Sequence, residues 1–88
     1  MNINITDLKK KIIYRSGYRG TKEMDSLLGS FAKKYVNTLN DEDLICLSKL
    51  MEVDDENLYK FNQGHRTTVK FDDNNVNKLF KNFVYKKI

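Results

Sequence analysis

The stretch YRSGYRGTKEMDSLLGSF, residues 14–31, ends one predicted helix and begins the next. Gly17 has no Cβ and is a natural stop for the helix before it. The second helix is expected from about Gly20 or Thr21 to Leu39, because its apolar residues recur at intervals of three and four. These residues are Met24, Leu27, Leu28, Phe31 and Tyr35. The stretch therefore predicts two helices joined by a short polar turn.

Capping residues mark the limits of the other helices. Thr6 is the expected N-cap of the first helix, and Asn40 and Asp54 are the expected N-caps of the third and fourth. Acidic residues follow each of the latter two and favour the positive end of a helix dipole. Gly64 is expected to end the fourth helix. An extended connector should follow, and the last helix should begin near residue 74 or 75.

Length and composition favour one small helical domain. The 88 residues include no proline and four glycines, so few residues interrupt helices, and 40% of them are hydrophobic. A chain of this size has room for one modest core and for no large enclosed cavity. We therefore expect an all-α, compact single-domain bundle of about five helices over residues 1–88.

Several protein classes are disfavoured by what the sequence lacks. Cys46 is the single cysteine and cannot form a disulfide within the chain, and one histidine adds too few ligands for a structural zinc site. No apolar run reaches the roughly 18 residues of a membrane-spanning helix. No phosphate-binding glycine loop is present. We expect a cytoplasmic protein that is not an enzyme, binds no metal and inserts into no membrane.

The positive charge of the chain leaves a second class open. The formal net charge is +4, and two basic segments flank an acidic one. The alternative function is therefore that of a small basic helical protein that binds nucleic acid or regulates another protein. Its candidate contact residues are Lys78, Lys81, Lys86 and Lys87. We expect no nucleic-acid binding, because lysines near helix ends are more often solubilising than base-reading.

The turn between the first two helices holds more polar residues than a helix start needs. In a purely structural interpretation, Gly20 is a permissive turn or N-cap residue and Glu23, at the expected third helical position, accepts a free N–H. Arg19 would then form a surface ion pair with Glu23. This interpretation leaves Asp25 and the polar residues one turn before Arg19 unexplained.

A docking surface accounts for the remaining residues. Tyr14 and Arg15 precede the turn, and tyrosine and arginine are enriched among the residues that dominate protein interfaces. A residue without a Cβ, such as Gly20, lets another backbone come close. We therefore expect a partner to bind where the two helices meet.

Four motifs occur along the chain. R-G-x-x-E is present at residues 19–23, preceded by Y/W-R-S at residues 14–16 and continued by E-x-D-x-L-L-G-x-F at residues 23–31. An acidic segment of the type D-x-D-L-Y-x-W follows at residues 54–61, with Phe61 in place of the tryptophan. Together these motifs resemble the SdhE-type flavinylation factors, the bacterial and mitochondrial assembly factors of succinate dehydrogenase. The resemblance covers about residues 8–63; the connector and last helix, 64–88, show none.

The resemblance implies a helper rather than a catalyst. Members of the family bind the flavoprotein subunit of succinate dehydrogenase, or of the related fumarate reductase, and promote covalent attachment of FAD to a histidine of that subunit. By this analogy Gly20 lies at the closest approach to the partner, and Arg19 and Glu23 supply charged contacts. The residues that would extend this surface are Tyr14, Arg15, Asp25 and Tyr59. The chain itself is expected to hold no FAD stably and to be a monomer when free.

Overall fold

The computed structural model describes residues 4–85 and has five helices and no strand within them. The helices are α1 (Ile5–Gly17), α2 (Lys22–Tyr35), α3 (Asp41–Leu50), α4 (Asp55–Asn62) and α5 (Asn75–Lys81). The all-α bundle predicted from the sequence is thereby confirmed. Across residues 4–85, none of the helices combines the length and apolar character that a membrane crossing requires. Lys86 and Lys87, two of the candidate nucleic-acid contacts, lie outside the described residues.

Each helix begins at a side chain that accepts a hydrogen bond from the first turn. The N-caps of α3 and α4 are Asn40 and Asp54, as the sequence predicts, and those of α2 and α5 are Thr21 and Asn74. The prediction for α1 is wrong, because its N-cap is Asn4 and not Thr6. The Asn4 side-chain oxygen accepts from the N–H of Asp7 at 3.2 Å, and asparagine caps at least as well as threonine. Thr6 lies inside the first turn.

α2 differs from the prediction at both ends. It ends at Tyr35 instead of Leu39, and the N–H of Leu39 returns to the Tyr35 carbonyl in a turn after the helix. Because Thr21 is the N-cap, Glu23 is the second helical residue and not the third. The predicted bond from Glu23 back to the start of the helix is therefore absent among the described residues. Thr21 alone caps this turn, accepting from the N–H of Met24 at 3.2 Å.

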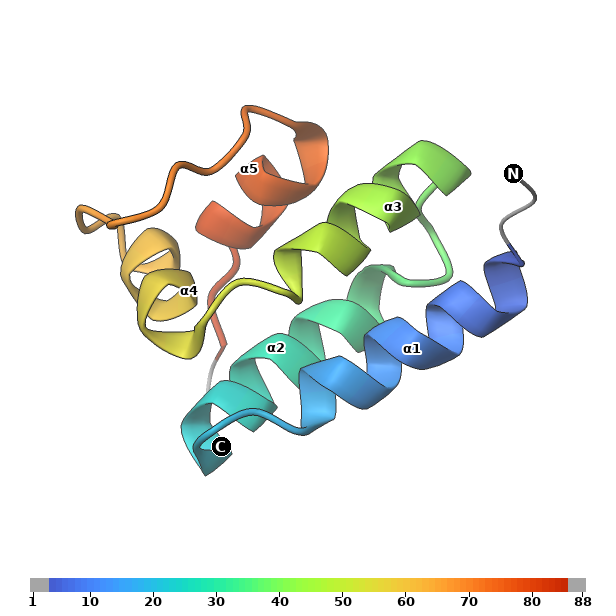
Figure 1. Cartoon of the computed structure of the whole chain (residues 1–88), viewed down its shortest axis with the longest axis horizontal. Coiled ribbons are helices and arrows are strands. Elements are labelled where there is room, and N and C mark those ends of the chain that lie inside the picture. Colours follow the sequence, from blue (N-terminus) through green and yellow to red (C-terminus); the bar gives the residue numbers. More distant parts are fainter. Residues whose placement is uncertain (1–3, 86–88) are drawn as a thin grey trace.

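The helices enclose one apolar core. α1 and α2 lie side by side as an antiparallel pair, and α3 packs against α1 and α5 (Figure 1). α4 contacts α5. The apolar stripe predicted for α2 is buried except for half-buried Tyr35. The largest fully buried apolar side chains come from all five helices: Phe31, Phe80, Ile12, Leu28, Leu44, Leu47, Leu58 and Val76.

The connector between α4 and α5 is tied to α4 by one buried amide. Gly64 ends the turn after α4 with φ 76°, a left-handed value that glycine adopts without strain. The side chain of Asn57 accepts the backbone N–H of Thr68 at 2.8 Å and donates to the Thr68 hydroxyl at 3.0 Å. The ring of Phe71 stacks on that of Phe61 with 4.0 Å between centroids. These contacts hold the extended connector against the bundle.

Aromatic side chains divide by type between the interior and the surface. Phe31 packs edge-on against Phe80 and Phe83, with centroids 5.1 and 5.2 Å away. None of the five phenylalanines is exposed. Four of the five tyrosines are exposed: Tyr14, Tyr18, Tyr59 and Tyr85. A tyrosine on the surface offers both an apolar ring and a hydroxyl, a combination suited to protein contacts.

Candidate protein–protein interface

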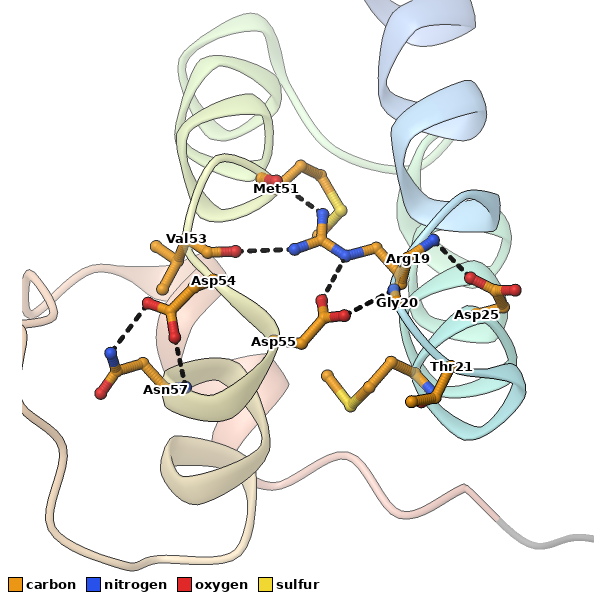
Figure 2. Close-up of polar contacts among 10 residues, drawn as sticks. Arg19, Gly20, Thr21, Asp25, Met51, Val53, Asp54, Asp55 and Asn57 are labelled. Carbon is orange, nitrogen blue, oxygen red and sulfur yellow. Dashed lines mark hydrogen bonds and ion pairs between the residues drawn. The ribbon is translucent and has the colours of Figure 1, made fainter.

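Arg19 lies between the turn that joins α1 to α2 and the segment that joins α3 to α4 (Figure 2). Its Nε donates to Asp55 Oδ1 at 2.7 Å. Its Nη1 and Nη2 donate to the backbone carbonyls of Met51 and Val53, both at 2.7 Å. Only 10% of the Arg19 side chain is exposed. All three guanidinium nitrogens therefore have an acceptor inside the molecule.

One of these acceptors lies at the C-terminal end of α3, where a cation is stabilised. Met51 is the C-cap of α3, and the last carbonyls of a helix lack partners within it and carry the negative end of its dipole. Asp55 is the first residue of α4. The surface ion pair that the sequence suggested between Arg19 and Glu23 is not formed, and that interpretation is wrong. Arg19 instead joins the α1–α2 turn to α3 and α4; we call this contact the Arg19–Asp55 junction.

Gly20 has a role inside the junction. Its N–H donates to Asp55 Oδ2 at 2.7 Å, so one carboxylate binds both Arg19 and Gly20. A Cβ at position 20 would lie 3.0 Å from the same oxygen, closer than most Cβ contacts. The missing Cβ therefore makes room for Asp55 as well as leaving an exposed backbone surface.

Asp25 holds the other side of the same turn. Its carboxylate accepts the backbone N–H of Arg19. The turn is thus fixed by Asp25 from α2 and by Asp55 from α4 (Figure 2). Of the predicted partner contacts, Asp25 and the Arg19 side chain are engaged within the molecule. At this turn, the group exposed to solvent is the backbone of Gly20.

Glu23 and Tyr59 lie on opposite walls of one groove. This α2/α4 groove has a volume of about 660 Å³ and is lined by the first half of α2, the end of α4 and residues from Lys81 to Tyr85. The Glu23 side chain is exposed and forms no ion pair with any described residue. Tyr59 is 48% exposed. The structure therefore brings together two predicted contact residues that are 36 positions apart in the sequence.

Tyr14 and Arg15 lie on a different side of the turn. Arg15 pairs with Glu52 at 3.1 Å in an exposed ion pair, which contributes little to stability. Tyr14 stacks on Tyr18, with ring centroids 4.6 Å apart. Tyr18 was not among the predicted contacts, and it is the more exposed of the two at 73%. The sequence holds no signal for this, because tyrosine is intermediate between the buried and the exposed residue types.

Comparison with known proteins identifies the family of the chain. The sequence model of one family, Sdh5, described as flavinator of succinate dehydrogenase, matches residues 10–84. The chain belongs to this family. The family resemblance seen in the sequence is confirmed, and the match extends beyond residues 8–63 to include the connector and α5.

Two curated relatives carry names that agree with the family. The chain is 34% identical over 80 residues to succinate dehydrogenase assembly factor 2, mitochondrial, of Lodderomyces elongisporus. It is 37% identical over 51 residues to the protein of the same name from Meyerozyma guilliermondii. These alignments cover 85% and 58% of the chain but 49% and 38% of the relatives, so the chain spans half or less of their length. No solved structure matches the chain significantly.

The structure describes two of the four lysines of the alternative nucleic-acid surface, Lys78 and Lys81. Lys78 pairs with Asp73 at 3.4 Å, and the Lys81 ammonium lies 5.9 Å from the centroid of the Phe61 ring. Both lysines thus contact groups of their own chain. Within residues 4–85 no three potential metal ligands lie together. What the candidate interface offers is a fixed backbone surface, one uncommitted carboxylate and exposed tyrosines.

Proposed function

We propose that the chain binds the flavoprotein subunit of succinate dehydrogenase, or of the related fumarate reductase, and promotes covalent attachment of FAD to that subunit. The observation that carries the proposal is membership of the flavinator family, with the R-G-x-x-E residues at an exposed turn. The names of the relatives describe assembly factors, which supports a helper role in which the bond-forming chemistry belongs to the flavin and its own protein.

The proposed docking surface consists of Gly20, Glu23 and Tyr59. Gly20 presents bare backbone, Glu23 an unpaired charge and Tyr59 an aromatic ring beside the α2/α4 groove. Tyrosine is enriched among the residues that dominate protein interfaces, and a partner that covered the groove would bury this ring. Arg19 and Asp25 act as positioning residues, because their side chains hold the turn and are engaged inside the chain. Tyr14 and Arg15 extend the surface at its edge.

Preorganisation is the physical contribution of the Arg19–Asp55 junction to this function. Ordering a loop when a complex forms costs free energy, and a loop that is already fixed avoids this cost. The turn at residues 18–21 is held by acceptors from α2, α3 and α4 before any partner arrives. We infer that the chain in turn holds the flavoprotein in a geometry that lets its histidine and flavin react.

FAD is proposed to stay with the partner. The chain has no glycine-rich phosphate cradle, which supports the expectation that it holds no FAD stably by itself. Titration of free FAD with the purified chain should leave flavin fluorescence unchanged.

The names of both relatives place those proteins in mitochondria, and the cytoplasmic location expected for this chain stays a prediction. Its monomeric state when free is also a prediction.

The test is a flavinylation assay on the cognate flavoprotein subunit. Covalent flavin is read as in-gel fluorescence after denaturation, with wild-type chain, with Glu23→Gln, with Tyr59→Ala and with no factor. Glu42→Gln is the matched control, because Glu42 is also an exposed acid in the first turn of a helix and lies outside the α2/α4 groove.

We expect fluorescence to rise with wild type and with Glu42→Gln, and to rise much less with Glu23→Gln or Tyr59→Ala. Circular dichroism should show all variants folded, since both substituted side chains are exposed. If wild type gave no more fluorescence than the sample without factor, the proposed function would be wrong for this pair of proteins. Equal fluorescence from all four chains would keep the function but exclude this docking surface.

A further inference from the structure

A second, larger groove runs along the outer side of the pair formed by α1 and α2. This α1/α2 groove has a volume of about 930 Å³ and is wide open to solvent. Its lining comes from residues 9–18, residues 25–37 and Tyr85. Gly29 and Ser16 are both buried between the two helices, and a Cβ on Gly29 would lie 3.8 Å from the Ser16 carbonyl oxygen. The floor of the groove is therefore a close, fixed helix contact.

The α1/α2 groove carries positive charge that the described residues do not balance. Lys9, Lys10 and Lys33 line it, and none of them forms an ion pair with a residue in the described part of the chain. Asp25 is the one acidic residue in its described lining, and its carboxylate already accepts the N–H of Arg19. An acidic ligand would therefore find complementary charge there.

Exposed aromatic rings lie beside this charge. The stacked pair Tyr14 and Tyr18 lines the groove where α1 ends, and the two side chains are 64% and 73% exposed. Two stacked rings hold each other in place, so they lose little freedom when a partner covers them. Tyrosine is among the residues that most often dominate binding free energy.

The α1/α2 groove is continuous with the docking surface. Ser26 and Tyr85 line both grooves, so the two hollows meet around the first half of α2. Glu23 lies on one side of this meeting point and Tyr14 and Tyr18 on the other. A single partner that covers the docking surface therefore has the α1/α2 groove directly beside it.

We propose that the α1/α2 groove is a second docking surface, which receives an acidic segment of the flavoprotein subunit. The lysines attract the segment and the tyrosine pair packs against its apolar side chains. This proposal rests on the proposed function, since it takes the same partner. It adds a second contact site and the charge of the segment that binds there. Glu23 and Tyr59 contact one part of the subunit, and the lysines of the α1/α2 groove contact an acidic part next to it.

The experiment compares two triple charge reversals with the same change in net charge. The groove variant is Lys9→Glu, Lys10→Glu, Lys33→Glu. The control variant is Lys11→Glu, Lys49→Glu, Lys70→Glu, whose lysines are exposed, line neither groove and form no ion pair in the described residues. Lys33 and Lys49 each lie in the last turn of a helix, so the effect on helix dipoles is matched. Binding of the purified flavoprotein subunit is measured by biolayer interferometry at low and at high salt.

We expect the groove variant to bind the subunit about tenfold more weakly at low salt, mainly through slower association, because charges at the edge of an interface act on the encounter rate. The control variant should bind within about twofold of wild type. High salt should weaken wild type and remove most of the difference. Circular dichroism and thermal unfolding of both variants verify that each is folded.

Four outcomes would overturn the proposal. Equal binding by the groove variant and wild type would leave the proposed function intact and exclude an acidic segment here. Equal weakening of both triple variants would show an effect of net charge without a site. If sedimentation showed wild type but not the groove variant to self-associate, the occupant would be a second copy of the chain. Absence of any wild-type binding would instead reject the proposed function, and this proposal with it.

Discussion

Arg19 and Asp55 are 36 positions apart and form an ion pair with 2.7 Å between Nε and Oδ1. The other oxygen of the same carboxylate accepts the N–H of Gly20 at 2.7 Å. The arginine and glycine of the R-G-x-x-E motif thus bind one acid that the motif does not contain. The motif is local in sequence, but its geometry depends on where α4 begins.

The Arg19–Asp55 junction should contribute measurably to stability. Asp55→Asn keeps the shape of the side chain but removes the charge that faces a guanidinium only 10% exposed. We expect the free energy of unfolding to fall by about 1–3 kcal/mol, because a largely buried cation loses its counter-charge. Urea unfolding followed by circular dichroism measures this change.

Glu56→Gln is the control for that substitution. Glu56 pairs with Lys60 at 2.9 Å, but the Glu56 side chain is 75% exposed, so solvent screens the pair. Its removal should cost less than about 0.5 kcal/mol. If Asp55→Asn cost no more than Glu56→Gln, the junction would add nothing to stability and the rigidity argued for the turn would lose its support.

Gly20→Ala should act through Asp55. The new Cβ would lie 3.0 Å from Asp55 Oδ2 and push the carboxylate a few tenths of an ångström, which weakens the bonds from its two donors, for an expected loss of about 1 kcal/mol. In a chain that already carries Asp55→Ala, the same substitution should cost almost nothing, because the two sites are coupled. Gly17→Ala is the control, since nothing lies within 4 Å of a Cβ there. Additive losses from Gly20→Ala and Asp55→Ala would contradict this mechanism.

Much of the fold could be predicted because its signals are local. Asn40 and Asp54 cap their helices by accepting from an N–H three residues ahead, so the sequence contains both partners in one short window. The buried face of α2 follows from helical spacing alone. The wrong N-cap of α1 arose because Asn4 and Thr6 are both good capping residues, and their order of preference is weak.

The contacts of the candidate interface could not be predicted in the same way. Three acids are possible ion-pair partners of Arg19, namely Glu23, Asp25 and Asp55. The sequence favours Glu23, because it is the nearest to Arg19 along the chain. The fold decides otherwise, because the α3–α4 segment brings two carbonyls and a carboxylate to the guanidinium at once. Periodicity shows which face of a helix is buried but not which residue of another helix lies opposite.

Core packing gives a prediction that is independent of any partner. Leu28 is fully buried in α2, so Leu28→Ala should lower the free energy of unfolding by about 3 kcal/mol through lost apolar contact and a cavity. Leu39 packs against the core but is only partly buried, and Leu39→Ala should cost about 1 kcal/mol. Urea unfolding measures both. A smaller loss for Leu28→Ala than for Leu39→Ala would be inconsistent with this core.

Asp54 should give the chain a specific dependence of stability on pH. Hydrogen bonds from the Asn57 side chain at 2.8 Å and from its backbone N–H at 3.2 Å lower the pKa of Asp54 below its ordinary value of 3.8. Both bonds favour the charged carboxylate, which the unfolded chain does not stabilise in this way. The contribution of Asp54 to stability is therefore complete well above pH 3.8 and is lost as the pH falls from there through the lowered pKa of the folded state.

Asp54→Asn isolates this effect, because asparagine still caps a helix but does not titrate. The other carboxyl groups titrate in both chains, so they cancel in the difference between the two free energies of unfolding. That difference should be constant near neutral pH and should change in favour of the asparagine variant as the pH falls through the range in which Asp54 gains its proton. Urea unfolding at a series of pH values measures it. A difference that stayed constant down to the lowest pH would show that the bonds from Asn57 do not discriminate between the charged and the neutral Asp54.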